Sequence, residues 1–185
     1  MSGLHAMLVH FPLAFWALAI LMILVAAFVP SRWGGLCKGG LLPVLVFSLL
    51  GGIAGIISGW IIWPTDANLY SPLVRNHILM AFWSMGIFAV ITALAWRFKE
   101  EAFEGCFRWV MVVLALAGGL LFAITGTLGG HLAGSPTHFS ELLAATGWTV
   151  YETFYVPDWV LVVLLLLAVI SAFAGFTAKA VKTSR

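Results

Sequence analysis

The chain has 185 residues, of which 63% are hydrophobic and only 9% are charged, and its formal net charge at pH 7 is +2. An average soluble domain has about 25% charged residues, so this composition excludes a soluble globular protein. The same composition excludes intrinsic disorder. Because one spanning helix needs about 20 residues, the chain has room for about four to six of them. The sequence therefore predicts an all-α, polytopic membrane helix bundle.

Five apolar stretches contain no Asp, Glu, Lys or Arg, and each is long enough to cross the hydrocarbon core as a helix. They cover about 6–29, 41–63, 77–96, 109–130 and 159–178. Tryptophans at several of their ends (Trp63, Trp96, Trp109 and Trp159) are typical of the aromatic belt at a membrane surface. The first stretch is longer than the core of a signal peptide, so we expect it to stay in the mature protein.

The five predicted spans divide the chain into three parts. Residues 1–134 form a four-helix core, and residues 159–185 form a fifth span with a basic tail. Between them, residues 135–158 form an outer loop, in which THFSELLAATGW predicts a short amphipathic helix at the interface. Ser135 and Pro136 are expected to be the N-cap and the first residue of that helix.

Lysine and arginine are distributed unequally between the two sides of these spans. Only Arg75 falls on the side that holds the N-terminus. The other eight cations fall on the opposite side: Arg32, Lys38, Arg97, Lys99, Arg108, Lys179, Lys182 and Arg185. By the positive-inside rule we expect the N-terminus outside and the C-terminus inside a bacterial inner membrane, with the periplasm as the outer side.

All five histidines, His5, His10, His77, His131 and His138, fall on the predicted outer side. A histidine at membrane depth is costly and marks a functional site, and neutral imidazole binds haem iron, copper and zinc. No cysteine lies on this side, which argues against a closed structural zinc site. Two imidazoles from facing helices in an apolar bundle favour a bis-histidine b-type haem.

The candidate ligands are His10, His77, His131 and His5, and their pairing is open. The first and third spans are diagonal in an up-down bundle, which favours His10 with His77. The main rival pairs His10 with His131, and His131 could instead pair with His5 on a second haem. His5 is rotated roughly 140° from His10 around the first helix, so both do not readily serve one iron. His138 fits best as a hydrogen-bonded loop residue.

Glycines and one arginine complete the expected cofactor site. Gly51, Gly55 and Gly59 lie four residues apart on one face of the second span, and such faces serve helix packing in membranes. For the glycines near the level of the histidines, Gly59 and Gly126, the alternative to helix packing is that they leave space for a cofactor. Arg75 precedes His77 by two residues and could pair with a haem propionate, or be an ordinary interfacial arginine. The expected cofactor-binding residues are Arg75, Gly59, Gly126, Gly129 and Gly130.

Three segments also carry a family pattern. The chain begins LHAMLVHFPLAFW, the third span opens RNHILMAFW, and the fourth ends TGTLGGHLAG. This pattern resembles the bacterial membrane-protein family called domain of unknown function 2231 over residues 3–134, with Ala6 where the family has proline. The family motifs fall on His5, His10, Pro12, His77, Gly129, Gly130 and His131. Members occur beside or fused to c-type cytochromes, so the resemblance implies haem binding and electron transfer.

The sequence thus predicts a membrane-embedded b-type cytochrome subunit without catalytic residues. It would relay electrons between quinol or a redox subunit and a c-type cytochrome within a larger complex, using one haem b, or two if His131 pairs with His5. One alternative is a non-redox assembly or anchor subunit. The other is a protein that handles copper or zinc at the outer face; against transport, the inner halves lack the polar path that a transporter needs. Nothing in the sequence indicates nucleic-acid binding.

Overall fold

A computed structural model describes residues 2–62, 70–153 and 158–183, and for residues 2, 158 and 172–183 it describes the backbone only. All regular structure in these residues is helical, as predicted, and none of it is strand. The helices are α1 (Ser2–Phe28), α2 (Arg32–Ile62), α4 (Pro72–Phe98), α5 (Gly105–Leu132), α6 (Phe139–Ala145) and α7 (Asp158–Thr183), with a 3-10 turn η1 (Lys99–Phe103) between α4 and α5.

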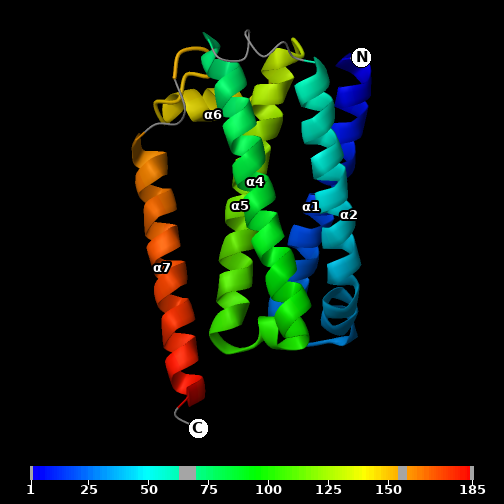
Figure 1. The fold of residues 1–185 in the computed structure, drawn as a ribbon, viewed down its shortest axis with the longest axis vertical. Helices are drawn as coiled ribbons and strands as arrows, with labels where there is room; N and C mark the ends of the chain where they lie inside the picture. The colour runs from blue at the N-terminus through cyan, green and yellow to red at the C-terminus, as the bar shows by residue number, and fades with distance from the viewer. Residues whose placement is uncertain (1, 63–69, 154–157, 184–185) are drawn as a thin grey trace.

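Four helices, α1, α2, α4 and α5, are each long and apolar enough to cross a membrane. They run alternately up and down in one bundle (Figure 1). Helix α1 packs against α2 and α5, while α4 packs against the same two neighbours, so α1 and α4 stand on a diagonal. The expected four-helix core is therefore present, with its first and third helices diagonal, and the fold is that of a multi-pass helical membrane protein.

The helices extend beyond the apolar stretches that predicted them. Helix α2 begins at Arg32, nine residues before the expected start at Leu41. Helix α4 begins at Pro72, with the Ser71 side chain accepting a hydrogen bond from the Val74 amide at 3.4 Å. Proline and serine are favoured at these two positions. Hydropathy marks only the part of a helix that fits the hydrocarbon layer, whereas the backbone hydrogen bonds continue past it.

Aromatic stacking fills the centre of the bundle. Trp16 of α1 stacks on Phe88 of α4, with ring centroids 4.7 Å apart and planes within 4°. Its edge also meets Phe122 of α5 at 4.4 Å and 83°. Trp16 is 3% exposed and Phe88 is fully buried. These rings join the diagonal pair α1 and α4 through dispersion contacts, which drive helix association in a membrane.

The small-residue face of α2 sets the rotation of α1. A Cβ atom on Gly51 would lie 3.2 Å from Pro12 Cδ, and one on Gly55 would lie 3.3 Å from Val9 Cγ1. Glycine lets the two backbones approach closely, as in other small-residue membrane interfaces. The α1 face that carries Val9, Pro12 and Trp16 therefore points into the bundle. Gly51 and Gly55 have the packing role expected of them.

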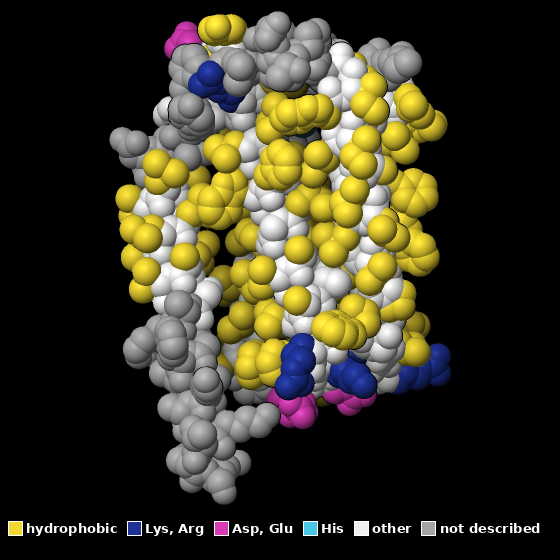
Figure 2. Space-filling model, in the orientation of Figure 1, with side chains coloured by type: hydrophobic (Ala, Val, Ile, Leu, Met, Phe, Trp, Pro, Cys, Tyr) yellow, Lys and Arg dark blue, Asp and Glu magenta, His cyan; other side chains and the backbone are white. Residues whose placement is uncertain are grey.

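Helix α7 stands beside the bundle rather than in it (Figures 1 and 2). Its first turns contact the rest of the protein: Val160 and Leu164 pack on a cluster around Trp148, and the Trp159 Nε1–H group donates to the Thr146 carbonyl at 3.1 Å. Within the described side chains, Trp159–Ser171 is an apolar segment shorter than a full span. The fifth span therefore stays a prediction.

Charges gather at one end of the four-helix bundle, where α1 and α4 end and α2 and α5 begin. Figure 2 shows Lys, Arg, Asp and Glu side chains at this lower end below a broad hydrophobic band. The opposite end holds the start of α1 and the short helix α6, which lies at one side of the bundle, crosswise to its helices (Figure 1). The assignment of these ends to membrane sides stays a prediction. Trp63, Asp66 and Arg185, and the side chains of Lys179 and Lys182, lie outside the described part.

Candidate functional site

His5 lies in the first turns of α1 and faces α2. Its Nδ1 atom is 2.9 Å from the Ser58 Oγ atom. The Ser58 hydroxyl itself donates to the Gly55 carbonyl at 2.8 Å, so it accepts from His5. The proton is therefore on Nδ1, and Nε2 carries a lone pair. A Cβ atom on Gly59 would lie 3.0 Å from His5 Cε1, so the absence of a side chain there admits the ring.

His77 in α4 contacts α5 in the same way that His5 in α1 contacts α2. Its Nδ1 atom is 2.9 Å from the Thr125 carbonyl oxygen. A carbonyl only accepts, so Nδ1 carries the proton and Nε2 again has the lone pair. A Cβ atom on Gly129 would lie 3.1 Å from His77 Cε1. Sequence reasoning named the two glycines and missed Ser58 and Thr125, which neighbour them in the same helices.

All four core helices thus contribute to one layer near the end of the bundle that holds the start of α1. His5 and His77 come from the diagonal helices α1 and α4, each near the start of its helix and so at the same end of the bundle. Gly59 and Gly129 come from the other two helices. Among the described residues, neither Nε2 atom has a hydrogen bond. A histidine that binds a metal commonly donates its other ring N–H to an oxygen, as both do here.

The position of His10 differs from the prediction, which favoured His10 as the ligand paired with His77. It is exposed on the outward face of α1, and its Nδ1 atom bonds to the Ala6 carbonyl of its own helix. His5, rather than His10, is the α1 histidine that faces the neighbouring helix α2, at the same end of the bundle as His77. The reason is the rotation of α1: His5 lies on the inward face with Val9 and Pro12, and the rotation of roughly 140° turns His10 away.

The described contacts of His131 are with Tyr151 rather than with His5 or His77. Its Nδ1 atom is 2.7 Å from the Tyr151 hydroxyl oxygen, and the two rings meet edge to face at 5.1 Å. Its Nε2 atom is buried and has no partner in the described part of the chain. Tyr151 belongs to the outer loop, so the histidine at the end of α5 anchors that loop.

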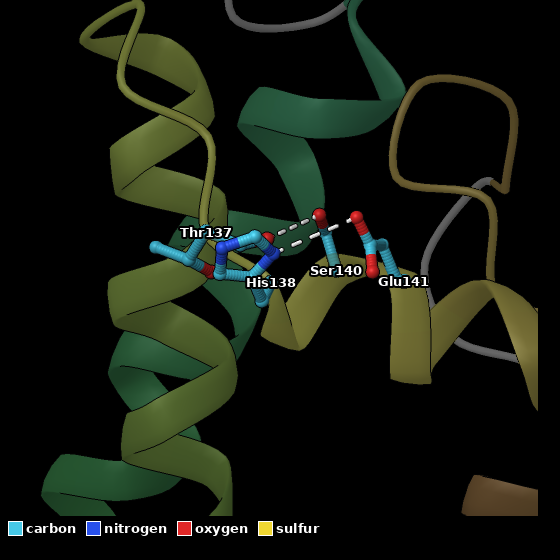
Figure 3. A network of polar contacts seen from close by, with 4 residues as sticks. All are labelled: Thr137, His138, Ser140 and Glu141. Atoms are coloured by element: carbon cyan, nitrogen blue, oxygen red, sulfur yellow. Dashed lines mark hydrogen bonds and ion pairs between the residues drawn. The ribbon is translucent and has the colours of Figure 1, made fainter.

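His138 lies outside the layer at the start of α6. Its Nδ1 atom is 3.7 Å from the Glu141 Oε1 atom, and both side chains are exposed. The neighbouring Ser140 hydroxyl donates to the Thr137 carbonyl at 2.6 Å (Figure 3). These contacts belong to the first turn of α6, and His138 is an exposed surface residue, as expected. Its distance to Glu141 is too long for the side-chain hydrogen bond that the sequence predicted.

Helix α6 begins at Phe139 rather than at Pro136. Ser135 does not cap it, because the Ser135 amide donates to the Gly130 carbonyl at 2.8 Å and closes the end of α5. Gly134, with φ +72°, makes this turn possible.

The remaining expected cofactor residues have different positions. Gly130 packs against the Ser135 carbonyl in the turn that ends α5. Gly126 is exposed on α5, and a Cβ atom there would meet no atom within 4 Å. Neither glycine contacts the histidine pair. Arg75 is half-buried in the first turn of α4, at the same end of the bundle as His77.

The histidine layer offers two imidazoles as potential metal ligands. In the described residues, no three His, Cys, Asp or Glu side chains form a metal-binding group. A bis-histidine haem needs only two imidazoles, because the porphyrin supplies the other four donors. Two imidazoles alone are too few for a structural zinc ion, which takes four protein ligands.

No protein-family model matches this chain, and no curated protein or solved structure shows a significant match. The resemblance over residues 3–134 therefore rests on its motifs alone. The fold defines a multi-pass helical membrane protein with a histidine layer at one end.

Proposed function

We propose that the protein is a haem-binding electron-transfer subunit of a bacterial inner membrane, in which His5 and His77 would hold one b-type haem. The observation that supports this most is the matched state of the two imidazoles. Each donates Nδ1–H to an oxygen of a neighbouring helix and keeps its Nε2 lone pair. A haem iron bound there would supply one-electron transfer.

The surrounding residues would act as orienting groups. Ser58 and the Thr125 carbonyl hold the two rings and fix their tautomers, which raises the basicity of the ligating nitrogen. Gly59 and Gly129 leave the space that the rings occupy. Arg75 would pair with a propionate at the membrane surface.

The histidine layer lies at one end of the bundle, so one haem there would not carry electrons across the whole membrane. The protein would then exchange electrons with a partner at its outer face, such as a c-type cytochrome, and with quinol or a redox subunit inside the membrane. This role belongs to a component of a larger complex. The N-terminus would face the periplasm, in keeping with the distribution of lysine and arginine.

The two other candidate functions predict different properties of the same layer. A copper- or zinc-handling protein would bind the bare ion at the histidines, although two imidazoles leave such an ion incompletely ligated. An assembly subunit would bind neither metal nor haem and would be colourless.

The test is haem retention in single variants purified with haem supplied in excess. His5→Ala and His77→Ala should each lose at least nine-tenths of the bound haem, because one imidazole then remains. His138→Ala is the matched control and should retain it, because His138 is exposed and outside the layer. Full haem content in His77→Ala with correct folding would overturn the proposed ligand pair.

A further inference from the structure

The charged end of the bundle, where α2 and α5 begin, holds cations that no carboxylate of the described residues neutralises. The described side chains there include five Lys and Arg and three Glu: Arg32, Lys38, Arg97, Lys99 and Arg108, and Glu100, Glu101 and Glu104. None of the five cations forms an ion pair with a described carboxylate. Glu104 precedes Arg108 by four residues, the usual spacing of a helical ion pair, and still the two do not pair. This end therefore has positive charge available for an outside anion.

Aromatic rings, rather than carboxylates, lie beside four of these cations. The distances from the Arg Cζ or Lys Nζ atom to the ring centroid are 5.6 Å for Arg32 on Trp33, 5.8 Å for Lys38 on Phe103, 5.5 Å for Arg97 on Phe98 and 5.4 Å for Arg108 on Trp109. The face of a ring attracts a cation but does not neutralise its charge. The rings therefore stabilise these side chains and leave the charge open to an anion.

Arg108, near the start of α5, is the cation whose guanidinium group is held in one orientation. The residue is half-buried, and its Nε atom is enclosed by the protein. Its two Nη atoms are not enclosed, and they have no hydrogen bond with the described residues. The group thus keeps its inner edge inside the protein and presents two N–H groups at its outer edge. Two parallel N–H groups match two oxygens of a phosphate group.

The ring beside Arg108 belongs to an apolar surface that faces away from the bundle. Trp109 meets Phe28, the last residue of α1, with ring centroids 5.6 Å apart. Trp109 is 52% exposed and Phe28 is 49% exposed, so both rings border the outside. Figure 2 shows the Lys and Arg side chains of this end directly below the hydrophobic band. Because α1 and α5 are long and apolar enough to cross a membrane, Arg108 would lie at the level of the lipid headgroups.

We propose that Arg108, Trp109 and Phe28 bind the phosphodiester head of an anionic phospholipid. The two Nη atoms of Arg108 donate to two phosphate oxygens. The rings of Trp109 and Phe28 pack against the glycerol and the first part of an acyl chain, at the seam where α1 meets α5. The proposal goes beyond the haem function and does not depend on it.

The surroundings of Arg108 favour this ligand over other anions. Free phosphate has no apolar part to cover the two rings, whereas a phospholipid brings its head and its chain together. The unneutralised cations nearby repel the choline group of phosphatidylcholine and attract the net negative charge of phosphatidylglycerol. Basic groups at the ends of membrane helices bind anionic headgroups in this way.

The test measures how much radiolabelled dioleoyl phosphatidylglycerol binds to the purified, immobilised protein in detergent. Arg108→Gln should weaken binding about fivefold or more, because it removes the charged fork. Lys99→Gln is the matched control: it removes the same charge at the same end, but Lys99 is exposed and lies over no described ring. Its affinity should stay within about twofold of that of the unaltered protein, as expected for an exposed charge. Equal losses in the two variants would mean a diffuse field without a site and would overturn the proposal.

Arg108→Lys separates the fork from the charge. Lysine keeps the positive charge but cannot present two parallel N–H groups, so binding should weaken about threefold or more. Unchanged affinity in Arg108→Lys would contradict the two-point contact with phosphate. The thermal midpoint of each variant in phosphatidylcholine micelles, which should match that of the unaltered protein, separates lost binding from lost folding.

Competition identifies the source of the phosphate. Unlabelled dioleoyl phosphatidylglycerol should displace the labelled lipid, and inorganic phosphate in large excess should not. Displacement by inorganic phosphate would assign the site to a free anion, and equal displacement by dioleoyl phosphatidylcholine would remove the selectivity for anionic lipid; either result would overturn the proposal. The titration is repeated on His77→Ala. Unchanged lipid affinity in that variant shows that this site stands or fails separately from the haem site.

Discussion

His5 and His77 are held by the same device from diagonal helices of one bundle. Each imidazole donates its Nδ1–H group to an oxygen on an adjacent helix, at 2.9 Å in both cases, and packs against a glycine of that helix. The layer is therefore built from two ring-plus-glycine halves, one on α1 and α2 and one on α4 and α5. Such repetition is unexpected of histidines that only fill space, and it underlies the proposed haem site.

The glycine beside His77 should tolerate no side chain. Gly129→Ala places a Cβ atom about 3.1 Å from the His77 ring, and the ring cannot withdraw without lengthening its bond to Thr125. We expect lower thermal stability and altered haem spectra. Gly126→Ala is the control: its Cβ atom meets open space, and alanine in a helix interior is favoured over glycine by about 1 kcal/mol. A Gly129→Ala protein as stable as Gly126→Ala would contradict this packing.

The aromatic centre should carry much of the stability of the bundle. Trp16→Ala removes the stacking on Phe88 and the edge contact with Phe122, and truncation of a large buried ring costs about 3–5 kcal/mol. Unfolding in a mixed-micelle denaturant series would measure this loss. Trp159→Ala, at a half-exposed site on α7, should cost much less. Similar losses for both variants would argue against the aromatic centre.

Asn76 should hold the outer turn against α4. Asn76→Ala leaves the Thr153 carbonyl without its donor, and such a loss costs about 1–3 kcal/mol. Amide hydrogen exchange in residues 148–153 should then become faster, while exchange in the centre of α2 stays unchanged. Unchanged exchange in the turn would mean that other contacts, such as Tyr151 with His131, hold it alone.

The two free cysteines test the predicted orientation. Cys37 and Cys106 lie near the starts of α2 and α5, at the charged end of the bundle, and Cys106 is exposed. If this end faces the cytoplasm, a membrane-impermeant maleimide should label Cys106 in inverted vesicles and leave it unlabelled in right-side-out vesicles. Cys106→Ser identifies the labelled site. Labelling in right-side-out vesicles alone would reverse the orientation.

The sequence predicted where the helices lie along the chain better than it predicted which face of each helix points into the bundle. Apolar stretches located the four core helices, because the hydrocarbon layer requires them, and the charges between them marked the ends. The choice between His5 and His10 depended on which face of α1 meets Gly51, Gly55 and Gly59. The sequence did indicate which face points inward, because His5, Val9, Pro12 and Trp16 are spaced three or four residues apart and so lie on one side of a helix. His10 was favoured as the ligand only because it lies further into the apolar stretch than His5.

The long-range polar contacts had no such signal. Asn76 bonds to a carbonyl 77 residues away, and His131 bonds to Tyr151 across the end of α5. Any of several polar residues in the outer loop could have met either partner, and only the folded turn selects among them. Likewise, the role of Ser135 in closing α5 depends on Gly134 at positive φ, which the Ser-Pro pattern alone did not distinguish from a helix cap.

The most direct test of the central claim is a reduced-minus-oxidised visible spectrum of the purified protein, together with a pyridine haemochrome assay. We predict a low-spin b-type spectrum and about one haem per chain, because His5 and His77 would supply one pair of histidine ligands. A protein that is folded and purified with haem supplied, yet shows no haem signal, would contradict the account. A ratio near two would add a second haem and require ligands outside the layer formed by His5 and His77.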